Sequence, residues 1–568
     1  PPPPPPPPPA ANRTLDLQGF APAAGFLRAS GSGAAGDGRF GLPVAGGHDA
    51  DLDGHRDYAR ANMLASPLGR ARAGGVQLIF GDGRIAGNVD LAVPNNRVLN
   101  IVGDGAQEAT GGEIWMADVT GDGAGDLIIG RPNFRAAAPD RIGAGALTII
   151  VGGPALRTLA TNGATLDLRA PPPSVRIVTL VGAATLDRLG FWMRTGDITG
   201  DGVDDIAVGA DQEDTGGAVN SGAVYVIRGG PHLDANLTVD LAGFGATALD
   251  GRIFRVLPPP GSADYHFGAT VALADLDGNR RAELIASASL NRAGGVLLAE
   301  GAPPGSAVGS GGNPGGSVFI LWDDNLPAGA LWPANLTFTM GALPISQTRI
   351  DGGSVAGQYT NDRFGEEILG GLDYNGDAAP DVFFGDITGQ ATGRDAAGVG
   401  HVFFTAARLK NRSFTMSAPP VDIALTTIFG PSAGAIFSDT AAHGDFDNDG
   451  IDDLAVSSPT ASPFGRVSAG IMHVIWGRSG NWPAVVDLLD ARKPSPALLR
   501  ITDIFGARGD VSASDRGDTL MYSAASADMD RDGRDDLIVN EMRGNGVSPA
   551  ATDVGNLLVI GGAAIPKQ

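Results

Sequence analysis

Residues 196–210 read GDITGDGVDDIAVGA, and this stretch decides the fold because close relatives of it recur along the chain. It joins a turn rich in Asp and Gly to a short apolar run. Copies start at Asp49, Asp118, Asp197, Asp275, Asp373, Asp445 and Asp528. From the first copy to the last, the start moves 479 residues in six steps, about 80 residues per step. Seven regular copies predict one array of repeated supersecondary units.

A second pattern follows the copies. About 15 to 35 residues after most of them comes an apolar, β-branched run, which predicts a buried strand. These runs lie at 76–80, 146–151, 223–227, 317–322, 401–404, 471–476 and 556–560. Short alternating pieces come next, and they predict half-exposed strands near a sheet edge. They lie at 166–168, 239–241, 338–340, 414–416 and 486–488. With 86 Gly, 40 Pro and no Cys, the chain is typical of many short strands joined by turns.

The sequence does not begin at the start of a repeat unit, and it does not finish at the end of one. The chain begins with late-unit strands, TLDLQGF at 14–20 and GFLRASG at 25–31, and it finishes on NLLVIGG at 556–562. We therefore expect the amino-terminal strands to complete the last blade, because closing a ring removes the free sheet edge. The predicted fold is all-β, a seven-bladed β-propeller over residues 12–568.

Residues 1–11 precede this propeller and begin with nine prolines. Such a run predicts an extended polyproline II arm or linker. It lacks the basic start and apolar stretch of a signal peptide, so a secreted chain would have its signal removed or upstream of this numbering. No apolar run is long enough to cross a bilayer.

Most acidic residues of the chain are Asp rather than Glu. The net charge is −23, and 55 of the 63 acidic residues are Asp. The short Asp side chain suits tight turns, where it reaches its own backbone or a cation held there. A surface of this sign disfavours nucleic acid as a partner.

The repeated turns predict calcium loops. Positions 1, 3, 5 and 9 offer side-chain oxygens, and position 7 offers its backbone carbonyl. Position by position, the seven loops supply Asp49, Asp51, Asp53, His55 and Asp57; Asp118, Thr120, Asp122, Ala124 and Asp126; Asp197, Thr199, Asp201, Val203 and Asp205; Asp275, Asp277, Asn279, Arg281 and Glu283; Asp373, Asn375, Asp377, Ala379 and Asp381; Asp445, Asp447, Asp449, Ile451 and Asp453; and Asp528, Asp530, Asp532, Arg534 and Asp536.

Oxygen donors without sulfur or nitrogen favour Ca²⁺, so up to seven Ca²⁺ ions are expected. The loops are not EF-hands, because position 12 is apolar (Val208, Val456) and the flanks are strand-like. The alternative is a turn that favours Asp and Gly for conformation alone. Loops 1, 6 and 7, with four carboxylates each, are expected to bind tightest. Arg280 and Ala378 stand where other loops have Gly and are expected to take a left-handed conformation.

These residues resemble the FG-GAP repeat of integrin α-subunit propellers and of many bacterial secreted proteins. The loop pattern is the family's D-x-[DN]-x-D-G-x-x-D, and the Phe-Gly pair occurs at 40–41, 267–268 and 364–365, with Leu189-Gly190 close to it. Units 2, 6 and 7 lack a clear pair. The resemblance implies a seven-bladed ring with calcium on one face and partner binding on the other face or at the rim.

The expected function is a non-catalytic, calcium-binding adhesion or protein-interaction module, secreted or on the cell surface, alone or in a larger assembly. Its partner would be a protein, with a glycan as a further candidate. The alternative is a carbohydrate-active propeller, either a lectin or a lyase. No His pair has metal-site or catalytic spacing, and most of the seven His are expected at turns or the surface. The two Arg-Gly-Asp tripeptides, at 508–510 and 516–518, are interpreted as structural, and residues 301–316 as a tolerated loop.

Overall fold

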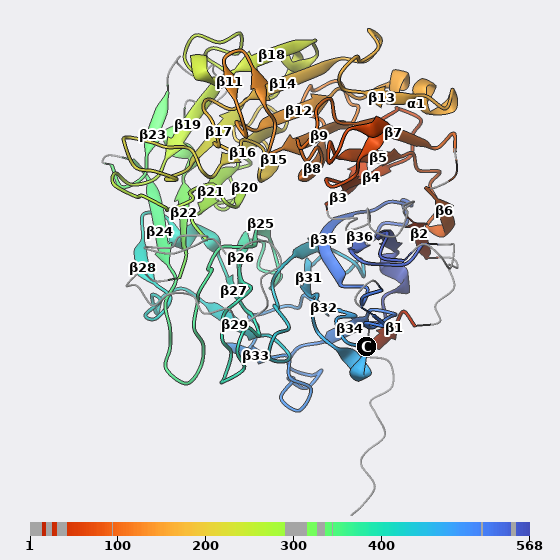
Figure 1. The fold of residues 1–568 in the computed structure, drawn as a ribbon. Coiled ribbons are helices and arrows are strands. Elements are labelled where there is room, and N and C mark those ends of the chain that lie inside the picture. The colour runs from red at the N-terminus through yellow and green to blue at the C-terminus, as the bar shows by residue number, and fades with distance from the viewer. Residues whose placement is uncertain are drawn as a thin grey trace, which may run out of the picture.

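The computed structural model describes residues 14–18, 25–30, 43–91, 93, 95–289, 315–326, 336–342, 345–512, 515–546 and 552–567. Seven five-stranded sheets stand around a common axis as the blades of a ring (Figure 1). The predicted all-β, seven-bladed propeller is confirmed. The polyproline arm, the Phe40-Gly41 pair and nearly all of the 301–316 insertion lie outside the described residues.

The blades are numbered along the chain, and each is given from its inner strand outward. Blade 1 contains β3 (Val44–His48), β4 (Asp57–Asn62), β5 (Gly75–Ile79), β7 (Val98–Val102) and β13 (Thr165–Asp167). Blade 2 contains β8 (Glu113–Ala117), β9 (Asp126–Arg131), β12 (Ala146–Ile150), β14 (Ile177–Val181) and β18 (Leu237–Asp240). Blade 3 contains β15 (Met193–Gly196), β16 (Asp205–Ala210), β17 (Ala223–Ile227), β19 (Ile253–Leu257) and β23 (Thr337–Thr339). Blade 4 contains β20 (Val271–Ala274), β21 (Glu283–Ser287), β22 (Ser317–Leu321), β24 (Gln347–Asp351) and β28 (Ser413–Thr415).

Blade 5 contains β25 (Ile368–Leu372), β26 (Asp381–Asp386), β27 (Val399–Phe403), β29 (Leu425–Phe429) and β33 (Val485–Asp487). Blade 6 contains β30 (Ala441–Gly444), β31 (Asp453–Ser458), β32 (Ile471–Ile475), β34 (Ile501–Phe505) and β1 (Thr14–Asp16). Blade 7 contains β35 (Leu520–Ala527), β36 (Asp536–Glu541), β37 (Asn556–Ile560), β2 (Phe26–Ser30) and β6 (Ala86–Asp90). Outside the blades lie the ribbon of β10 (Ala136–Ala137) and β11 (Asp140–Arg141), the helix α1 (Pro154–Thr161), and the 3₁₀ turns η1 (Pro67–Gly69), η2 (Pro231–Leu233), η3 (Leu241–Gly243), η4 (Asp323–Asn325), η5 (Ala406–Leu409), η6 (Pro463–Gly465) and η7 (Gly562–Ala564).

Four strands of each blade run antiparallel, and the fifth comes from a neighbouring unit. In sequence, β13 lies between β12 and β14 of blade 2, yet it pairs in parallel with β7 of blade 1. The apolar runs predicted as buried strands are confirmed within two residues, and the alternating pieces are confirmed as outermost strands. Each alternating piece therefore covers the edge of the preceding blade, which ties consecutive blades together.

Strands from both ends of the sequence meet in the same region of the ring. β2 pairs antiparallel with β37, and β1 pairs in parallel with β34. Figure 1 shows these two red strands among the blue carboxy-terminal ones. Blade 7 thus contains strands from both ends of the described chain.

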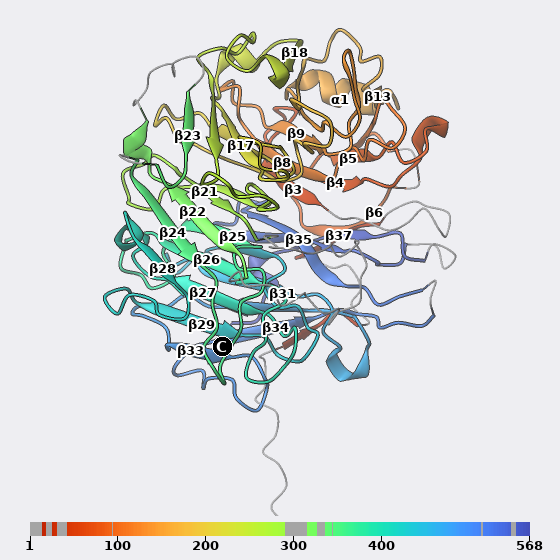
Figure 2. The same cartoon turned by 60° about the vertical axis from the view of Figure 1, so that its left-hand side comes forward.

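The core lies between adjacent blades. One cluster joins Ile128 and Leu147 of blade 2 to Ile206 and Tyr225 of blade 3, and all four side chains are at most 1% exposed. Figure 2 shows the twisted sheets arranged face to face. The middle strands β16 and β17 are buried along their whole length because both faces of a blade pack on neighbours. Each fully buried Ile or Leu contributes about 1.5–3 kcal/mol.

A glycine before the third strand marks each blade boundary. Gly222 has φ +82°, and a Cβ there would lie 2.2 Å from the carbonyl oxygen of Phe267, with which it forms a parallel bridge. Gly398 stands in the same relation to Phe437. The Phe of the Phe-Gly pair is thus the residue of the next unit that contacts this glycine. Unit 6 has the same Phe, in the pair Phe437-Ser438.

We predict that Gly222→Ala lowers the free energy of unfolding by about 3 kcal/mol, because alanine would combine a left-handed conformation with a backbone clash. Gly217→Ala is the matched control: φ is +83° and no atom lies within 4 Å of the added Cβ. The control should cost about 1 kcal/mol. Denaturant unfolding of both variants measures the difference, and equal losses would contradict the boundary role of Gly222.

Candidate metal centres

The seven acidic loops, numbered as the blades that contain them, join the first and second strands. Loop 6, for example, connects β30 to β31. The position-9 acid is in every case the first residue of the second strand: Asp57, Asp126, Asp205, Glu283, Asp381, Asp453 and Asp536. The loops therefore join β-strands, as the sequence predicts.

Position 1 and position 5 hold the turn by hydrogen bonds. In loop 6, the carboxylate of Asp445 accepts the backbone N–H groups of Asp449 (3.0 Å) and Gly450 (2.7 Å). Asp449 accepts the N–H of Ile451 at 3.1 Å. Equivalent bonds to the position-1 and position-5 side chains recur in the other six loops. The turn itself thus favours Asp at position 1 and Asp or Asn at position 5, whatever the loop binds.

The backbone is left-handed at positions 4 and 6 of each loop. At position 6, Arg280 (φ +69°) and Ala378 (φ +62°) adopt it without glycine, as expected. The sequence reading missed position 4, where Leu52, Asn448 and Arg531 are also left-handed. A non-glycine residue in this region costs on the order of 1–3 kcal/mol, so loops 1, 4, 5, 6 and 7 store strain.

Position 9 anchors the loop to the blade. One oxygen of Asp453 accepts the N–H of Phe446 (3.1 Å), and the other accepts that of Gly477 (2.7 Å), just beyond the third strand. Burial raises the pKa of Asp453 to about 8, and it raises the pKa of Asp57 to about 8. In blade 4, Glu283 bonds Leu276 through one oxygen (2.7 Å), and burial raises its pKa to about 9.

Three carboxylates converge in four of the loops. One oxygen from each lies within 4.8 Å of the others in the sets Asp49, Asp51 and Asp53; Asp275, Asp277 and Glu283; Asp445, Asp447 and Asp453; and Asp528, Asp530 and Asp536. Within the described chain, loops 2, 3 and 5 form no such set, because position 3 is neutral there. In loop 3 the Thr199 hydroxyl instead donates to Asp197 at 3.2 Å.

Position 3 of these four loops carries buried oxygens that accept no hydrogen bond from a described residue. They are Asp51 Oδ2, Asp277 Oδ1, Asp447 Oδ1 and Asp530 Oδ1, whereas Asp447 Oδ2 forms an ion pair with Lys567. A buried acceptor left unpaired costs about 1–3 kcal/mol. A hard cation bound by several oxygens would remove that cost. The residues of loops 1, 4, 6 and 7 therefore fit Ca²⁺, while the position-7 carbonyls and the ligands of loops 2, 3 and 5 stay predictions.

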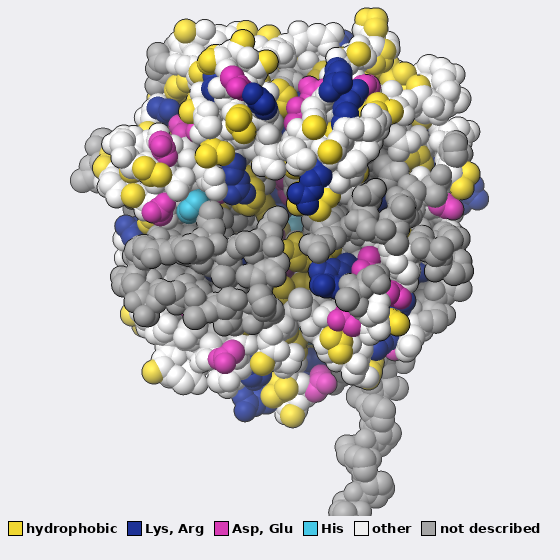
Figure 3. All heavy atoms as spheres, viewed as in Figure 1, with side chains coloured by type: hydrophobic (Ala, Val, Ile, Leu, Met, Phe, Trp, Pro, Cys, Tyr) yellow, Lys and Arg dark blue, Asp and Glu magenta, His cyan; other side chains and the backbone are white. Residues whose placement is uncertain are grey.

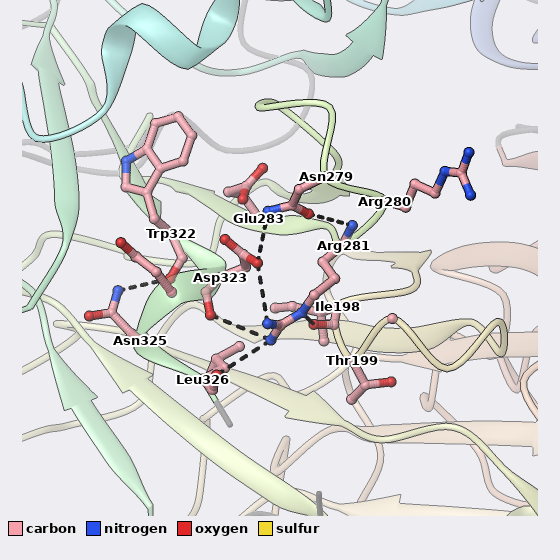
Figure 4. Close-up of polar contacts among 12 residues, drawn as sticks. Ile198, Thr199, Asn279, Arg280, Arg281, Glu283, Trp322, Asp323, Asn325 and Leu326 are labelled. Atoms are coloured by element: carbon pink, nitrogen blue, oxygen red, sulfur yellow. Dashed lines mark hydrogen bonds and ion pairs between the residues drawn. The ribbon is translucent and has the colours of Figure 1, made fainter. Parts of the chain in front are cut away.

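Loop 4 carries an acid that the sequence reading missed. Figure 4 shows Asn279 and Arg281 reaching toward Asp323, with Arg280 pointing away. Asn279 Nδ2 donates to Asp323 at 3.0 Å, and Arg281 lies 3.4 Å from the same carboxylate. The place taken by Asp323 is a glycine, such as Gly477, in most other blades. An acidic residue at a position that is glycine in most other blades was the feature of the sequence that could have identified Asp323.

A second group of acids lies where inner strands begin, close to the ring axis. Arg194 forms an ion pair with Glu113 (2.8 Å) and stacks on Trp115 and Trp192. Burial raises the pKa of Glu367 to about 8, opposed by Arg194 and reinforced by Asp439 and Glu113. Burial also raises the pKa of Asp439 to about 8. Burial thus favours the protonated forms of Glu367 and Asp439, whose pKa values it raises most in this group.

The structure also bears on two other expectations from the sequence, the Arg-Gly-Asp tripeptides and the histidines. Arg508 forms ion pairs with Asp515 (2.7 Å) and Asp518 (3.1 Å), so the two Arg-Gly-Asp tripeptides fold onto each other and Asp518 is buried. The structural interpretation agrees with the burial of Asp518 in the second tripeptide, whereas Asp510 of the first is exposed and its interpretation stays a prediction. The expectation that most His lie at turns or the surface is wrong: His48, His401, His443 and His473, four of the seven, lie within strands, and none of the four is exposed. They fill space between packed blades.

Figure 3 shows basic and acidic side chains interspersed over the described part of the face seen in Figure 1. Apolar side chains gather at its centre, where the inner strands converge. Within the described residues, no helix combines the length and apolarity needed to span a bilayer.

We predict that Glu367→Gln flattens the pH dependence of stability. The folded-state pKa of Glu367 lies above its unfolded value, so its contribution to stability is complete below about pH 4.5 and is lost as pH rises through about 8. Relative to wild type, the variant should gain about 4 kcal/mol between pH 5 and pH 9. Urea unfolding at both pH values measures this gain, with Asp250→Asn, an exposed site, as control. A parallel shift at both pH values would contradict the assignment.

Comparisons with known proteins identify the repeat. The sequence profile of the FG-GAP repeat matches residues 190–227 and 437–475. No curated protein sequence matches the chain. The crystal structure of the V. cholerae biofilm matrix protein Bap1 aligns over 96% of this chain and 92% of its own, at 11% identity and a TM-score of 0.24. The matched segments contain the Leu189-Gly190 and Phe437 positions or adjoin them, together with loops 3 and 6. The chain is a seven-bladed β-propeller that contains FG-GAP repeats.

Proposed function

We propose that this propeller is a calcium-stabilised, non-catalytic adhesion or protein-interaction module that works outside the cell. The observation that supports it most is the set of four loops in which three carboxylates converge and a buried position-3 oxygen has no hydrogen-bond donor. Such a site is costly without a cation and favourable with one. A rigid ring with satisfied loops would offer its faces and rim to a partner.

The charge of the chain supports an extracellular setting. Seven Ca²⁺ ions would bring the net charge from −23 to −9 and relieve the repulsion within each loop. Loops that rely on a few carboxylates in an exposed turn fill at extracellular calcium levels and stay largely empty in cytosol.

A saccharide ligand is the second candidate, and one cleft favours it. This cleft, of about 510 Å³, opens beside the outer strands of blade 2. Its walls combine Phe134 and Pro171–Pro173 with the polar side chains of Arg131 and Asn236. Apolar surfaces with a few polar groups are typical of small-ligand sites.

We predict that calcium raises the free energy of unfolding, by about 2.7 kcal/mol per site at a hundredfold excess over Kd. Asp530→Ala should remove one tight site in calcium calorimetry and reduce that gain. Asp250→Ala, which changes the charge equally at an exposed position, should bind as wild type does. Equal unfolding curves in calcium and in chelator would refute the proposed function.

A glycan array probed with and without calcium separates the two candidates. Adhesion through proteins predicts no saccharide binding under either condition. Saccharide binding that Phe134→Ala abolishes would instead assign the blade 2 cleft as the working site.

A further inference from the structure

Three basic side chains occupy equivalent places in the ring. Arg157, Lys410 and Lys567 each lie seven residues after the end of a third strand, β12, β27 and β37 respectively. Arg157 and Lys410 belong to the connections that lead from β12 and β27 to the outer strands β13 and β28, whereas Lys567 lies just after η7, and no described strand follows it. The chain has three lysines in all, and two of them are in this set.

Each of these side chains reaches back to the acidic loop of the preceding blade. Arg157 lies 3.6 Å from Asp51 of loop 1, and Lys410 lies 3.5 Å from Asp277 of loop 4. Lys567 forms ion pairs with Asp447 of loop 6 and, at 2.9 Å, with Asp449. The target in all three blades is the position-3 carboxylate, which keeps at least one buried oxygen without a hydrogen-bond donor.

Each cation also rests on an aromatic ring at one fixed place. The rings are those of Phe80, Trp322 and Trp476, each the first residue after the third strand of the preceding blade. The distances from the cation to the ring centroid are 5.0, 5.2 and 5.6 Å respectively. A cation over an aromatic face is attracted by the ring, so the ring fixes where the charge sits.

The basic residue is present where position 3 is acidic and absent where position 3 is neutral. Loop 2 has Thr120 at position 3, and the equivalent residue of blade 3 is Asp234, which pairs with Arg176 instead. Loop 5 has Asn375, and the equivalent residue is Trp482, while Asn375 bonds the neighbouring Asn481 at 3.0 Å. The charge at the blade boundary is therefore matched site by site.

Loop 7 is the exception. Asp530 is acidic, but the equivalent residue of blade 1 is Ala86, and no described basic side chain forms an ion pair with Asp530. Loops 6 and 7 otherwise share the same four-carboxylate pattern, DFDNDGIDD and DMDRDGRDD. The two loops thus share their four carboxylates, and they differ in the ion pair at position 3; loop 7 also has Arg531 and Arg534 where loop 6 has Asn448 and Ile451.

We propose that Arg157, Lys410 and Lys567 are built-in counter-ions that compete with calcium for the position-3 carboxylate of the preceding blade, so that loop 7 fills at lower calcium than loops 1, 4 and 6. This inference rests on the proposed calcium function. The three side chains are 32%, 29% and 25% exposed, so each can turn toward water when a metal enters. Without metal, the ion pair holds the loop to the next blade; with metal, Ca²⁺ replaces it.

The sharpest test uses Lys567→Met, which keeps the apolar stem on Trp476 and removes the charge. Its controls are Lys567→Arg, which keeps the charge, and Arg84→Met, which removes one charge from a side chain that is 79% exposed. Tb³⁺ reports on loop 6 through luminescence excited by Trp476, and Trp476→Phe identifies that part of the signal. Removing a like charge beside the site should lower the half-saturating Tb³⁺ concentration about tenfold in Lys567→Met and leave both controls unchanged.

Thermal unfolding supplies the second readout. In chelator, Lys567→Met should unfold at a lower temperature than wild type, because an ion pair is lost; in saturating calcium the difference should vanish or reverse. An equal loss in both conditions, with unchanged Tb³⁺ half-saturation, would show a purely structural ion pair and overturn the inference. Lys410→Met at loop 4 repeats the test at an independent site.

The outcome for loop 7 separates this inference from the proposed function. Asp530→Ala should remove the tightest calcium class in calorimetry, and Lys567→Met should add one ion to it. If loop 7 binds calcium and Lys567→Met adds nothing, the counter-ion role is wrong and the calcium function stands. If wild type and variants bind neither calcium nor Tb³⁺, both are wrong.

Discussion

Every blade of this ring has two apolar faces, and a neighbouring blade is what covers each of them. The middle strands are buried from end to end, and the core clusters join residues of adjacent blades. A single blade therefore has no core of its own, which makes the stability of one unit depend on the next. The glycine that precedes the third strand belongs to the same constraint, because the backbones of two units approach so closely there that a Cβ does not fit.

The outer strands extend that dependence to the blade edges. The alternating segment of one unit crosses to the preceding sheet and pairs with its fourth strand in parallel, so a solvent-facing edge is covered by another unit. In two cases the connection that makes this crossing also carries a basic residue: Arg157 lies between β12 and β13, and Lys410 lies between β27 and β28. These two connections therefore link consecutive blades and also place a positive charge beside an acidic loop.

The side-chain oxygens of each acidic loop fall into two groups. Asp at positions 1, 5 and 9 accepts backbone N–H groups and fixes the turn, while position 3 projects carboxylate oxygens that the turn leaves unused. This division explains why all seven loops keep their acidic framework although position 3 varies among Asp, Thr and Asn. Position 3 decides whether three carboxylates converge, and the other positions fix the shape of the turn.

The sequence by itself determined the number of blades, the strand runs, the place of each loop and the left-handed turn at Arg280 and Ala378, because period, alternation and turn chemistry are local properties of the chain. The tertiary structure alone decided which blade each outer strand joins, that Phe437 fills the Phe-Gly position, and that three histidines are buried. It also decided which acids converge and which cations face them. Lys567 and Asp447 are 120 residues apart and meet only because the ring brings consecutive blades together, a contact between units that no pattern within one unit contains.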